Sequence, residues 1–284
     1  MNNKLDAFEK HHDFLICVDS DGCAIDNLAT KHQLCFGPCL IREWELEKYQ
    51  EEILALWERI NLYGLTRGIH RFRALSLALT EINERLTPIQ GLSEYTAWVD
   101  STEDFSSASL EGQIRKTPSA ILEKVLHWSK QVNQAVAALP WTKKQFFEGV
   151  DESLSAVADM ADIAVVSSAN QDAVTVEWQH GGLSRHADIF LCQEAGSKAR
   201  CIAKLKEKGY HESRMLMVGD APGDRASAEV NGIAFYPILA GREKESWRAL
   251  PKAAQLFFKG EYQPLERRLL KEFMINLAGG KKYD

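Results

Sequence analysis

Two acidic motifs stand directly after apolar runs that are typical of buried strands. The first is Asp-Ser-Asp-Gly, beginning at Asp19, and the second is Gly-Asp-Ala-Pro-Gly-Asp, beginning at Gly219. In an open parallel sheet, ligands bind beyond the carboxyl ends of the strands, so carboxylates at these positions lie where chemistry is expected. Either motif alone could be a simple turn, with Asp bonding the backbone and Gly supplying a positive φ. Because both motifs follow strands, chance is a poor explanation, and four acidic residues become candidates for one site: Asp19, Asp21, Asp220 and Asp224.

A hydroxyl and an ammonium group occupy equivalent places in the sequence. Ser167 comes directly after the apolar run 163–166, and Lys198 follows the run 188–192 within a short loop. Taken singly, such a serine is usually a helix cap and such a lysine a solvated surface charge. The ordered series of acidic pair, serine, lysine and acidic pair, each just past a strand, favours one composite site instead.

The elements that must position these residues alternate between strand-like and helix-like segments. Five short runs are continuously apolar, a pattern typical of strands buried on both faces of a parallel sheet. Asn170 and Ser197 are suitable N-caps for helices that run through Trp178 and from residue 198 to about 208. Strand, helix, strand at this spacing predicts right-handed crossovers and a Rossmann-like, doubly wound α/β sheet with the first strand central. The predicted strands are residues 14–18, 163–166, 188–192, 215–218 and 233–236.

A long helical insertion separates the first predicted strand from the second. Between residues 27 and 140, apolar side chains recur at helical spacing among charged and amide side chains. Residues 100–112, rich in serine and acidic residues, predict a loop or a marginal helix. The segment that begins at Glu243 and contains Trp247 is expected to be a surface helix that closes the sheet edge. The predicted helices are residues 43–62, 71–82 and 119–139 in the insertion, and 243–258 and 264–277 after the sheet.

Composition excludes several classes of protein. The chain has 284 residues, of which 45% are hydrophobic and 26% charged, which is ample for a packed core. A formal net charge of −6 gives no global electrostatic reason to bind nucleic acid. The first residues lack the apolar core of a signal peptide, and no apolar run reaches the roughly 18 residues that span a bilayer. Six scattered cysteines favour buried free thiols over disulfides or a zinc site at Cys35 and Cys39, so we expect a cytoplasmic protein. From the net charge and the lack of a long apolar run, we expect no nucleic-acid or membrane partner.

The ordered residues resemble the four motifs of the haloacid dehalogenase (HAD) superfamily. The two acidic motifs, Ser167 and Lys198 are similar to those motifs in type, in order and in position after their strands. A helical insertion directly after the first motif is similar to the helical cap domains of that superfamily. The resemblance implies a catalytic core formed by residues 1–26 and 141–284 and an α-helical cap formed by residues 27–140.

The resemblance also implies a role for each candidate. Asp19 would attack phosphorus and form an aspartyl-phosphate, while Asp21 would protonate the leaving oxygen and then activate water. Mg²⁺ would be held by Asp19, the backbone carbonyl of Asp21 and Asp220, relieving the repulsion among crowded carboxylates and phosphate. Asp224 would orient a metal-bound water or the lysine. Ser167 would donate a hydrogen bond to the phosphoryl group, and the lysine would neutralise the nucleophile and the transferred charge.

An acid at position 21 narrows the chemistry that the resemblance implies. Members of the superfamily that cleave carbon–halogen bonds or phosphonates lack it, so hydrolysis or transfer of a phosphoester follows. The predicted function is a Mg²⁺-dependent phosphatase that acts on a small soluble phosphomonoester, a phosphorylated metabolite. Two alternatives stay open. One is a phosphosugar mutase, which returns the phosphoryl group to its substrate, and the other is a non-enzymatic, receiver-like switch with a long-lived phospho-Asp19.

Basic residues in the insertion are candidates for substrate binding. Arg67, His70, Arg71 and Arg73 lie close together in the sequence, and such clusters are usually solvated helix faces. The sharper hypothesis is that one or two of them point over the phosphate site and bind an anionic group of the substrate. His70 and Arg71 are the predicted substrate-binding residues.

Overall fold

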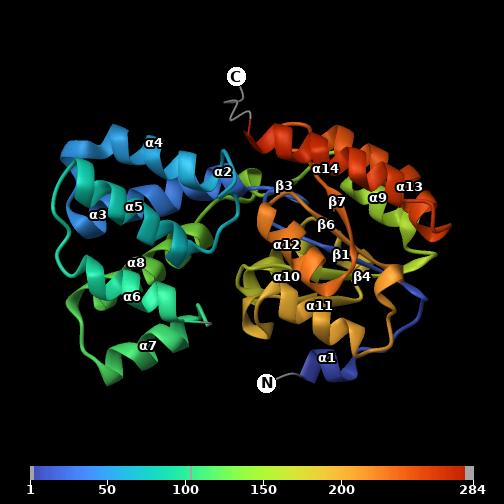
Figure 1. Cartoon of the computed structure of the whole chain (residues 1–284), viewed down its shortest axis with the longest axis horizontal. Helices are drawn as coiled ribbons and strands as arrows, with labels where there is room; N and C mark the ends of the chain where they lie inside the picture. The colour runs from blue at the N-terminus through green and yellow to red at the C-terminus, as the bar shows by residue number, and fades with distance from the viewer. Residues whose placement is uncertain (1–2, 103, 279–284) are drawn as a thin grey trace. The chain divides into compact units, whose positions relative to one another are not determined.

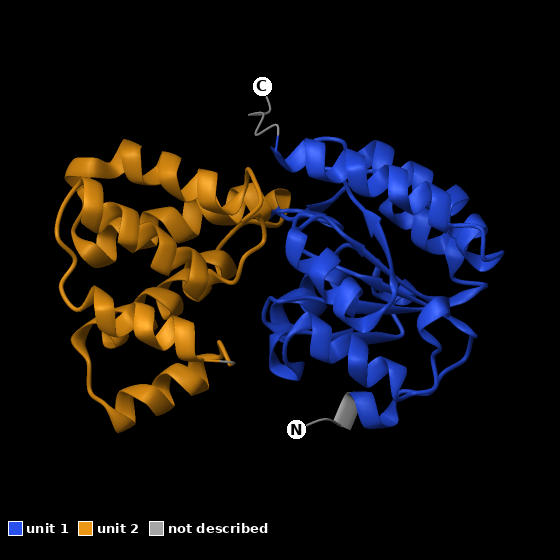
Figure 2. Cartoon of the chain, in the orientation of Figure 1, with its two compact units in different colours: residues 1–27, 144–284 blue, residues 28–143 orange. Residues whose placement is uncertain are grey.

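Two compact units make up the chain in this computed structural model, which describes residues 3–102 and 104–278. Unit 1 contains residues Met1–Asn27 and Lys144–Asp284, and unit 2 contains residues Leu28–Lys143 (Figure 2). The chain therefore leaves unit 1 once, after Asn27, and returns to it once, at Lys144.

Unit 1 is built on a five-stranded parallel sheet with the order β5-β4-β1-β6-β7 (Figure 1). The first strand is central, and its Val18 pairs with Val165 on one side and Val218 on the other. A separate antiparallel pair, β2 with β3, lies where the chain leaves and re-enters the unit. The strands are β1 (Phe14–Val18), β2 (Ile25–Asp26), β3 (Gln145–Phe146), β4 (Ala161–Val166), β5 (Ile189–Leu191), β6 (Met215–Gly219) and β7 (Ala234–Pro237).

Helices cover both faces of the parallel sheet. Ile16 and Val18 of β1 face a core shared with α9, α10 and α13, whereas Leu15 and Cys17 face a core shared with α1, α11, α12 and α14. Because helices bury both faces of the sheet, every position of its strands is suited to an apolar residue. The predicted doubly wound α/β class is confirmed. The helices are α1 (Asn3–Ala7), α9 (Val150–Val157), α10 (Gln171–His180), α11 (Lys198–Lys206), α12 (Pro222–Asn231), α13 (Glu243–Phe258) and α14 (Gln263–Ala278).

The edge strand β7 is covered by α14 and the turn before it. The Phe235 amide donates to Glu266 Oε1 at 2.7 Å, and the Tyr262 hydroxyl donates to the Phe235 carbonyl at 2.8 Å. The prediction that α13 closes this edge is wrong, although its bounds are confirmed. Trp247 and Leu250 of α13 are fully buried against a face of the sheet, because apolar residues three and four apart form a stripe along the helix.

Unit 2 is helical and has a core of its own, centred on Trp57, Phe72 and Trp128. The predicted helix over residues 43–62 is divided, because Glu45 adopts a left-handed conformation (φ 56°) that ends α3. Of the predicted loop or marginal helix over residues 100–112, residue 103 lies outside the described residues and residues 107–112 are helical, since the Ser106 hydroxyl accepts a bond from the Ser109 amide and starts α7. The helices are α2 (Leu28–Lys31), a π-helical turn (His32–Phe36), α3 (Gly37–Trp44), α4 (Gln50–Asn61), α5 (Arg71–Arg85), α6 (Leu92–Ser101), α7 (Ser107–Lys116) and α8 (Ala120–Ala137).

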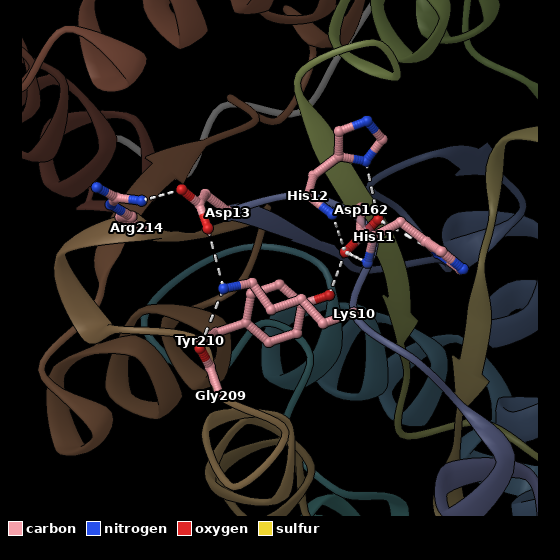
Figure 3. Close-up of polar contacts among 8 residues, drawn as sticks. All are labelled: Lys10, His11, His12, Asp13, Asp162, Gly209, Tyr210 and Arg214. Atoms are coloured by element: carbon pink, nitrogen blue, oxygen red, sulfur yellow. Dashed lines mark hydrogen bonds and ion pairs between the residues drawn. The ribbon is translucent and has the colours of Figure 1, made fainter.

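At the amino end of the sheet, the segment before β1 is tied to the first residues of β4 (Figure 3). The backbone amides of His11 and His12 donate to Asp162 Oδ2 at 2.9 and 3.0 Å, and the Tyr210 hydroxyl donates to the same oxygen. The His12 ring lies 2.9 Å from Asp162 Oδ1. Since Asp162 is 1% exposed, this carboxylate is an internal anchor whose two oxygens are both engaged.

All six cysteines are free and buried, as the sequence predicted. Cys35 and Cys39 lie in the core of unit 2, and within the described residues neither belongs to a group of side chains placed to hold a metal. Among those residues, no helix combines the length and the hydropathy that a bilayer crossing requires.

Candidate active site

The first acidic motif forms a tight turn at the carboxyl end of β1. The Asp19 amide donates to the Val218 carbonyl of β6 at 3.0 Å, so the backbone stays attached to the sheet up to this residue. Beyond it, the Ser20 carbonyl accepts from the amides of Ala24 and Ile25, both at 2.9 Å, and Gly22 has a φ of 78°. The turn leaves Asp19 buried, with 5% of the residue exposed, at the end of the central strand.

Two tryptophans hold this turn from outside the motif. The Trp178 indole donates to Ser20 Oγ at 3.0 Å, and the Trp247 indole donates to the Cys23 carbonyl at 2.8 Å. Both rings are fully buried. Sequence reasoning missed these residues, because a tryptophan among other core positions carries no local sign of the hydrogen bond that it makes.

The second acidic motif joins β6 to α12. Asp224 Oδ2 accepts from the Ala221 amide at 3.0 Å, which satisfies a backbone donor at the start of the helix. Gly219 is required for this packing, because a Cβ at that position would lie 2.4 Å from the Cβ of Asp224. The motif therefore fixes two buried carboxylates, those of Asp220 and Asp224, 1% and 0% exposed.

The structure brings Asp19, Asp220 and Asp224 together although they lie in two distant parts of the sequence. Each offers a carboxylate oxygen, and these oxygens all lie within 4.8 Å of one another. Lys198, at the start of α11, reaches the same place, with its Nζ 2.7 Å from Asp19 Oδ1 and 2.5 Å from Asp224 Oδ1. The Ser197 hydroxyl caps that helix by accepting from the Arg200 amide at 3.3 Å.

Burial and crowding set the protonation of this group. Burial raises the pKa of Asp19 well above its ordinary value, against the lowering effect of Lys198, and Asp224 and Asp220 raise it further. Burial likewise raises the pKa of Asp224, with Lys198 opposing. Burial alone would lower the pKa of Lys198, but Asp19 and Asp224 raise it, so this lysine stays an ammonium ion.

A divalent cation fits the donor set. Three carboxylates and the ammonium group of Lys198 lie together here, so with every acid ionised these four groups carry an excess of negative charge. Burial is the largest cause of the raised pKa values of Asp19 and Asp224, and repulsion within the cluster adds to it. A hard cation with oxygen ligands relieves it, and carboxylates are the side chains that Mg²⁺ prefers.

Ser167 and Asp21 lie at the same end of the sheet, and each accepts a hydrogen bond from a residue close to it in the sequence. Ser167 follows β4, is 3% exposed, and its Oγ accepts from the Ala169 amide at 3.2 Å. The Asp21 carboxylate is half-buried and accepts from the Asn27 side-chain amide at 2.8 Å. Their positions after β4 and β1, which are neighbours in the sheet, are those that the sequence indicated, and their chemical roles stay predictions.

The two predicted substrate-binding residues belong to unit 2, where both have internal contacts. His70 Nδ1 accepts from the Phe72 amide at 3.3 Å and caps α5, while burial and the nearby arginines lower the pKa of His70 to about 3. The Arg71 guanidinium donates to Asn133 Oδ1 at 2.7 Å and stacks over the Phe36 ring at 5.1 Å. A role in substrate binding stays a prediction for both.

Known protein structures resemble this fold. A haloacid dehalogenase-like family hydrolase from Xanthomonas campestris is 12% identical, with 90% of this chain and 99% of that chain covered and a TM-score of 0.52. A candidate phosphoglycolate phosphatase from Lactobacillus delbrueckii subsp. bulgaricus is 14% identical, with 79% and 85% covered and a TM-score of 0.50. At these identities the likeness shows the fold alone. No curated protein matches the chain.

A sequence-family comparison agrees with the resemblance drawn from the motifs. The profile of the haloacid dehalogenase-like hydrolases matches residues 79–238, which is more than half of the chain and includes Ser167, Lys198 and the second acidic motif. Asp19 and Asp21 lie before the matched segment, so their inclusion in the site rests on the motif and on the geometry described above. The chain belongs to the haloacid dehalogenase-like hydrolase family.

Proposed function

We propose that this protein is a Mg²⁺-dependent phosphatase that hydrolyses a small soluble phosphomonoester through an aspartyl-phosphate on Asp19. The observation that carries the proposal is the buried cluster of Asp19, Asp220 and Asp224 with Lys198 bridging two of its carboxylates. A carboxylate nucleophile, a fixed ammonium and a place for a cation are what phosphoryl transfer needs, because negative charge spreads over the phosphoryl oxygens.

The metal ligands are the carboxylates of Asp19 and Asp220 and the backbone carbonyl of Asp21. Asp224 is better suited to act without touching the metal, because both of its oxygens are already engaged. Lys198 donates to its Oδ1 at 2.5 Å, and the Ala221 amide donates to its Oδ2 at 3.0 Å. When bound, Mg²⁺ supplies positive charge that lowers the pKa of the nucleophile and stabilises the phosphoryl oxygens. Asp224 holds the lysine in place.

Asp19 attacks phosphorus, and the ammonium of Lys198 neutralises the charge that gathers around the new bond. Asp21 gives its proton to the leaving oxygen as the phosphorus–oxygen bond of the substrate breaks. It then takes a proton from the water that hydrolyses the aspartyl-phosphate, which restores the acid. Ser167 donates a hydrogen bond to a phosphoryl oxygen from the end of the neighbouring strand.

The substrate is a phosphorylated metabolite rather than a nucleic acid, because the formal net charge of −6 opposes binding to a polyanion. Unit 2 acts as the cap that excludes water during turnover, and His70 and Arg71 are the candidates for contact with an anionic group of the substrate. Six buried free cysteines suit a reducing compartment, so we place the protein in the cytoplasm.

The test is to screen the purified protein with Mg²⁺ against a panel of phosphorylated metabolites and to measure inorganic phosphate. We expect release of phosphate that stops on addition of EDTA and returns with excess Mg²⁺. Stopped-reaction mass spectrometry should find a transient phosphoryl group on Asp19 that is absent from Asp19→Asn. The matched control is Asp159→Asn, an exposed acidic residue just before β4, which should behave as the wild type.

Several outcomes would change the assignment. Turnover that persists in Asp19→Asn would contradict the proposed nucleophile. A labelled phosphosugar that isomerises without releasing phosphate would indicate a mutase. A phospho-Asp19 that lasts for hours without substrate turnover would indicate a switch.

A further inference from the structure

Asp21, the proposed acid and base, is held by a buried side-chain amide. Asn27 Nδ2 donates to Asp21 Oδ1 at 2.8 Å, and Asn27 itself is fully buried. Asn27 directly follows β2 and is the last residue of unit 1 before the chain enters unit 2. The acid is therefore hydrogen-bonded to the residue at which the chain leaves unit 1.

The same amide nitrogen also reaches a second buried carboxylate. Asn27 Nδ2 lies 3.3 Å from Glu177 Oε2, and Glu177, in α10, is 3% exposed. An amide NH₂ group has two donors and no acceptor, so contact with two carboxylates at once fixes which way the Asn27 side chain points. A flipped amide would place its carbonyl oxygen against both acids.

Glu177 links this amide to the point where the chain returns. Its Oε1 lies 3.7 Å from Nζ of Lys144, the first residue of unit 1 after the insertion, and the two side chains are 2% and 7% exposed. One carboxylate thus contacts both junction residues, Asn27 and Lys144. Buried ion pairs contribute little net stability because desolvation offsets their attraction, which favours a role in orientation instead.

We propose that Asn27 is a positioning residue for Asp21, fixed in turn by the Glu177–Lys144 pair. Because the amide N–H can only donate, Asp21 Oδ1 remains an acceptor and the proton that Asp21 transfers is carried on Oδ2. The amide thereby selects the oxygen that serves the leaving group and restricts rotation of the carboxyl group. This inference rests on the proposed function, in which Asp21 protonates the leaving oxygen.

The experiment compares aryl phosphates whose leaving groups differ in their need for a proton. 2,4-Dinitrophenolate leaves without protonation, whereas phenolate leaves poorly unless an acid assists it. The quantity to measure is kcat/KM, because it covers the steps up to transfer of the phosphoryl group to Asp19 and excludes hydrolysis of the intermediate. For Asn27→Ala with Mg²⁺, we expect a loss of about tenfold or more with phenyl phosphate and less than about threefold with 2,4-dinitrophenyl phosphate.

Two further variants separate positioning from folding. Asn231→Ala removes another buried side-chain amide of unit 1, which donates to the Ala199 and Ser227 carbonyls, and it should show no dependence on the leaving group. Glu177→Leu combined with Lys144→Met removes both charges together, so neither is left buried and unpaired. This double variant should fold and show the same dependence as Asn27→Ala, with a smaller loss.

The outcomes distinguish this inference from the proposed function. Asp21→Asn serves as the benchmark and should show the steepest dependence on the leaving group. If it does and Asn27→Ala loses equal activity with both substrates, or none, the positioning role is wrong. If wild-type turnover is absent, or Asp21→Asn shows no such dependence, the assignment of Asp21 fails and the inference fails with it.

Discussion

The two ends of the parallel sheet both bury carboxylates, but they balance them differently. At the amino end, hydrogen bonds from His12, Tyr210 and His11 outweigh the effect of burial and lower the pKa of Asp162. At the carboxyl end, burial and mutual repulsion raise the pKa of Asp19 and Asp224, although one lysine contacts both. The aspartate at the amino end thus has enough hydrogen-bond donors for its charge, whereas the aspartates at the carboxyl end carry more negative charge than the lysine neutralises.

This difference separates an anchor from a site. Hydrogen-bond donors already engage both oxygens of Asp162, so its negative charge requires no bound cation. This holds even though Asp162 also lies close enough to Asp188 and His11 for the three side chains to hold a metal ion. In the function proposed here, the cluster around Asp19 is completed by a cation and a substrate. Acidic residues with shifted pKa values are common at functional sites, because the repulsion that destabilises the empty site is offset when a ligand binds.

Asp19→Asn gives the largest expected effect on activity. We expect kcat/KM to fall by about 10⁴-fold or more, because the amide cannot act as the nucleophile. The free energy of unfolding of the metal-free protein should not fall, because one of three crowded carboxylates is removed. Chemical denaturation beside the activity assay tests both statements, and a marked loss of stability would show that Asp19 is a structural anchor.

Asp162→Asn should give the opposite result. The new NH₂ group faces N–H and O–H donors, so we expect the free energy of unfolding to fall by about 3 kcal/mol. We expect kcat/KM to stay within about twofold of the wild type, since Asp162 lies at the far end of the sheet. A large loss of activity in a variant that is still folded would show that Asp162 is not only a structural anchor.

Gly219→Ala tests how closely the second acidic motif is packed. The added methyl group would approach Asp224 to 2.4 Å, so this carboxylate must move away from Lys198. We expect kcat/KM to fall by about 10- to 100-fold through this misplacement. Gly223→Ala is the matched control, because its added Cβ meets no atom within 4 Å, and equal losses in the two variants would refute the packing argument.

The two ends should also give opposite dependences of stability on pH. The raised pKa values of Asp19 and Asp224 mean that the metal-free folded protein binds more protons than the unfolded chain, so stability falls as pH rises through those values. The lowered pKa of Asp162 means that its contribution is present above its ordinary pKa and is lost as pH falls through the lowered value.

Difference curves isolate each effect. In EDTA, the stability lost as pH rises above the ordinary pKa of an aspartate should be smaller in Asp220→Asn than in the wild type, by about 1 kcal/mol, because the variant lacks one repelling charge. Mg²⁺ should reduce the same loss in the wild type and have less effect in the variant. Parallel curves for the wild type and Asp220→Asn would show that the carboxylates at the carboxyl end do not interact.

Features that depend on local sequence could be predicted. The strands of the sheet are continuously apolar, and the side chains of Asn170 and Ser197 accept bonds from amides three residues on, as their N-cap positions implied. The grouping of Asp19 with Asp220 followed because parallel strands end at one edge. Each of these inferences needs only residue type, spacing and the rules of sheet topology.

Features that depend on distant partners could not be predicted. Asn27 has no motif of its own, and its contact with Glu177 joins residues 150 positions apart. The indole of Trp247 in α13 reaches the Cys23 carbonyl across an even longer separation, and its ring packs into the core on one face of the sheet. The end of α3 at Glu45 was missed because a left-handed residue other than glycine leaves little trace in sequence.

The insertion after β1 has a consequence for how the chain folds. β1 pairs with β4 and β6, which begin only at Ala161 and Met215, so the central strand has no partner until the ribosome has made most of the protein. Unit 2 is continuous in sequence and has its own core, so we expect it to fold first during synthesis. Unit 1 then assembles late and slowly, through contacts of high sequence separation. Because β1 is apolar and remains unpaired during much of synthesis, we expect chaperones to bind it until β4 and β6 are made.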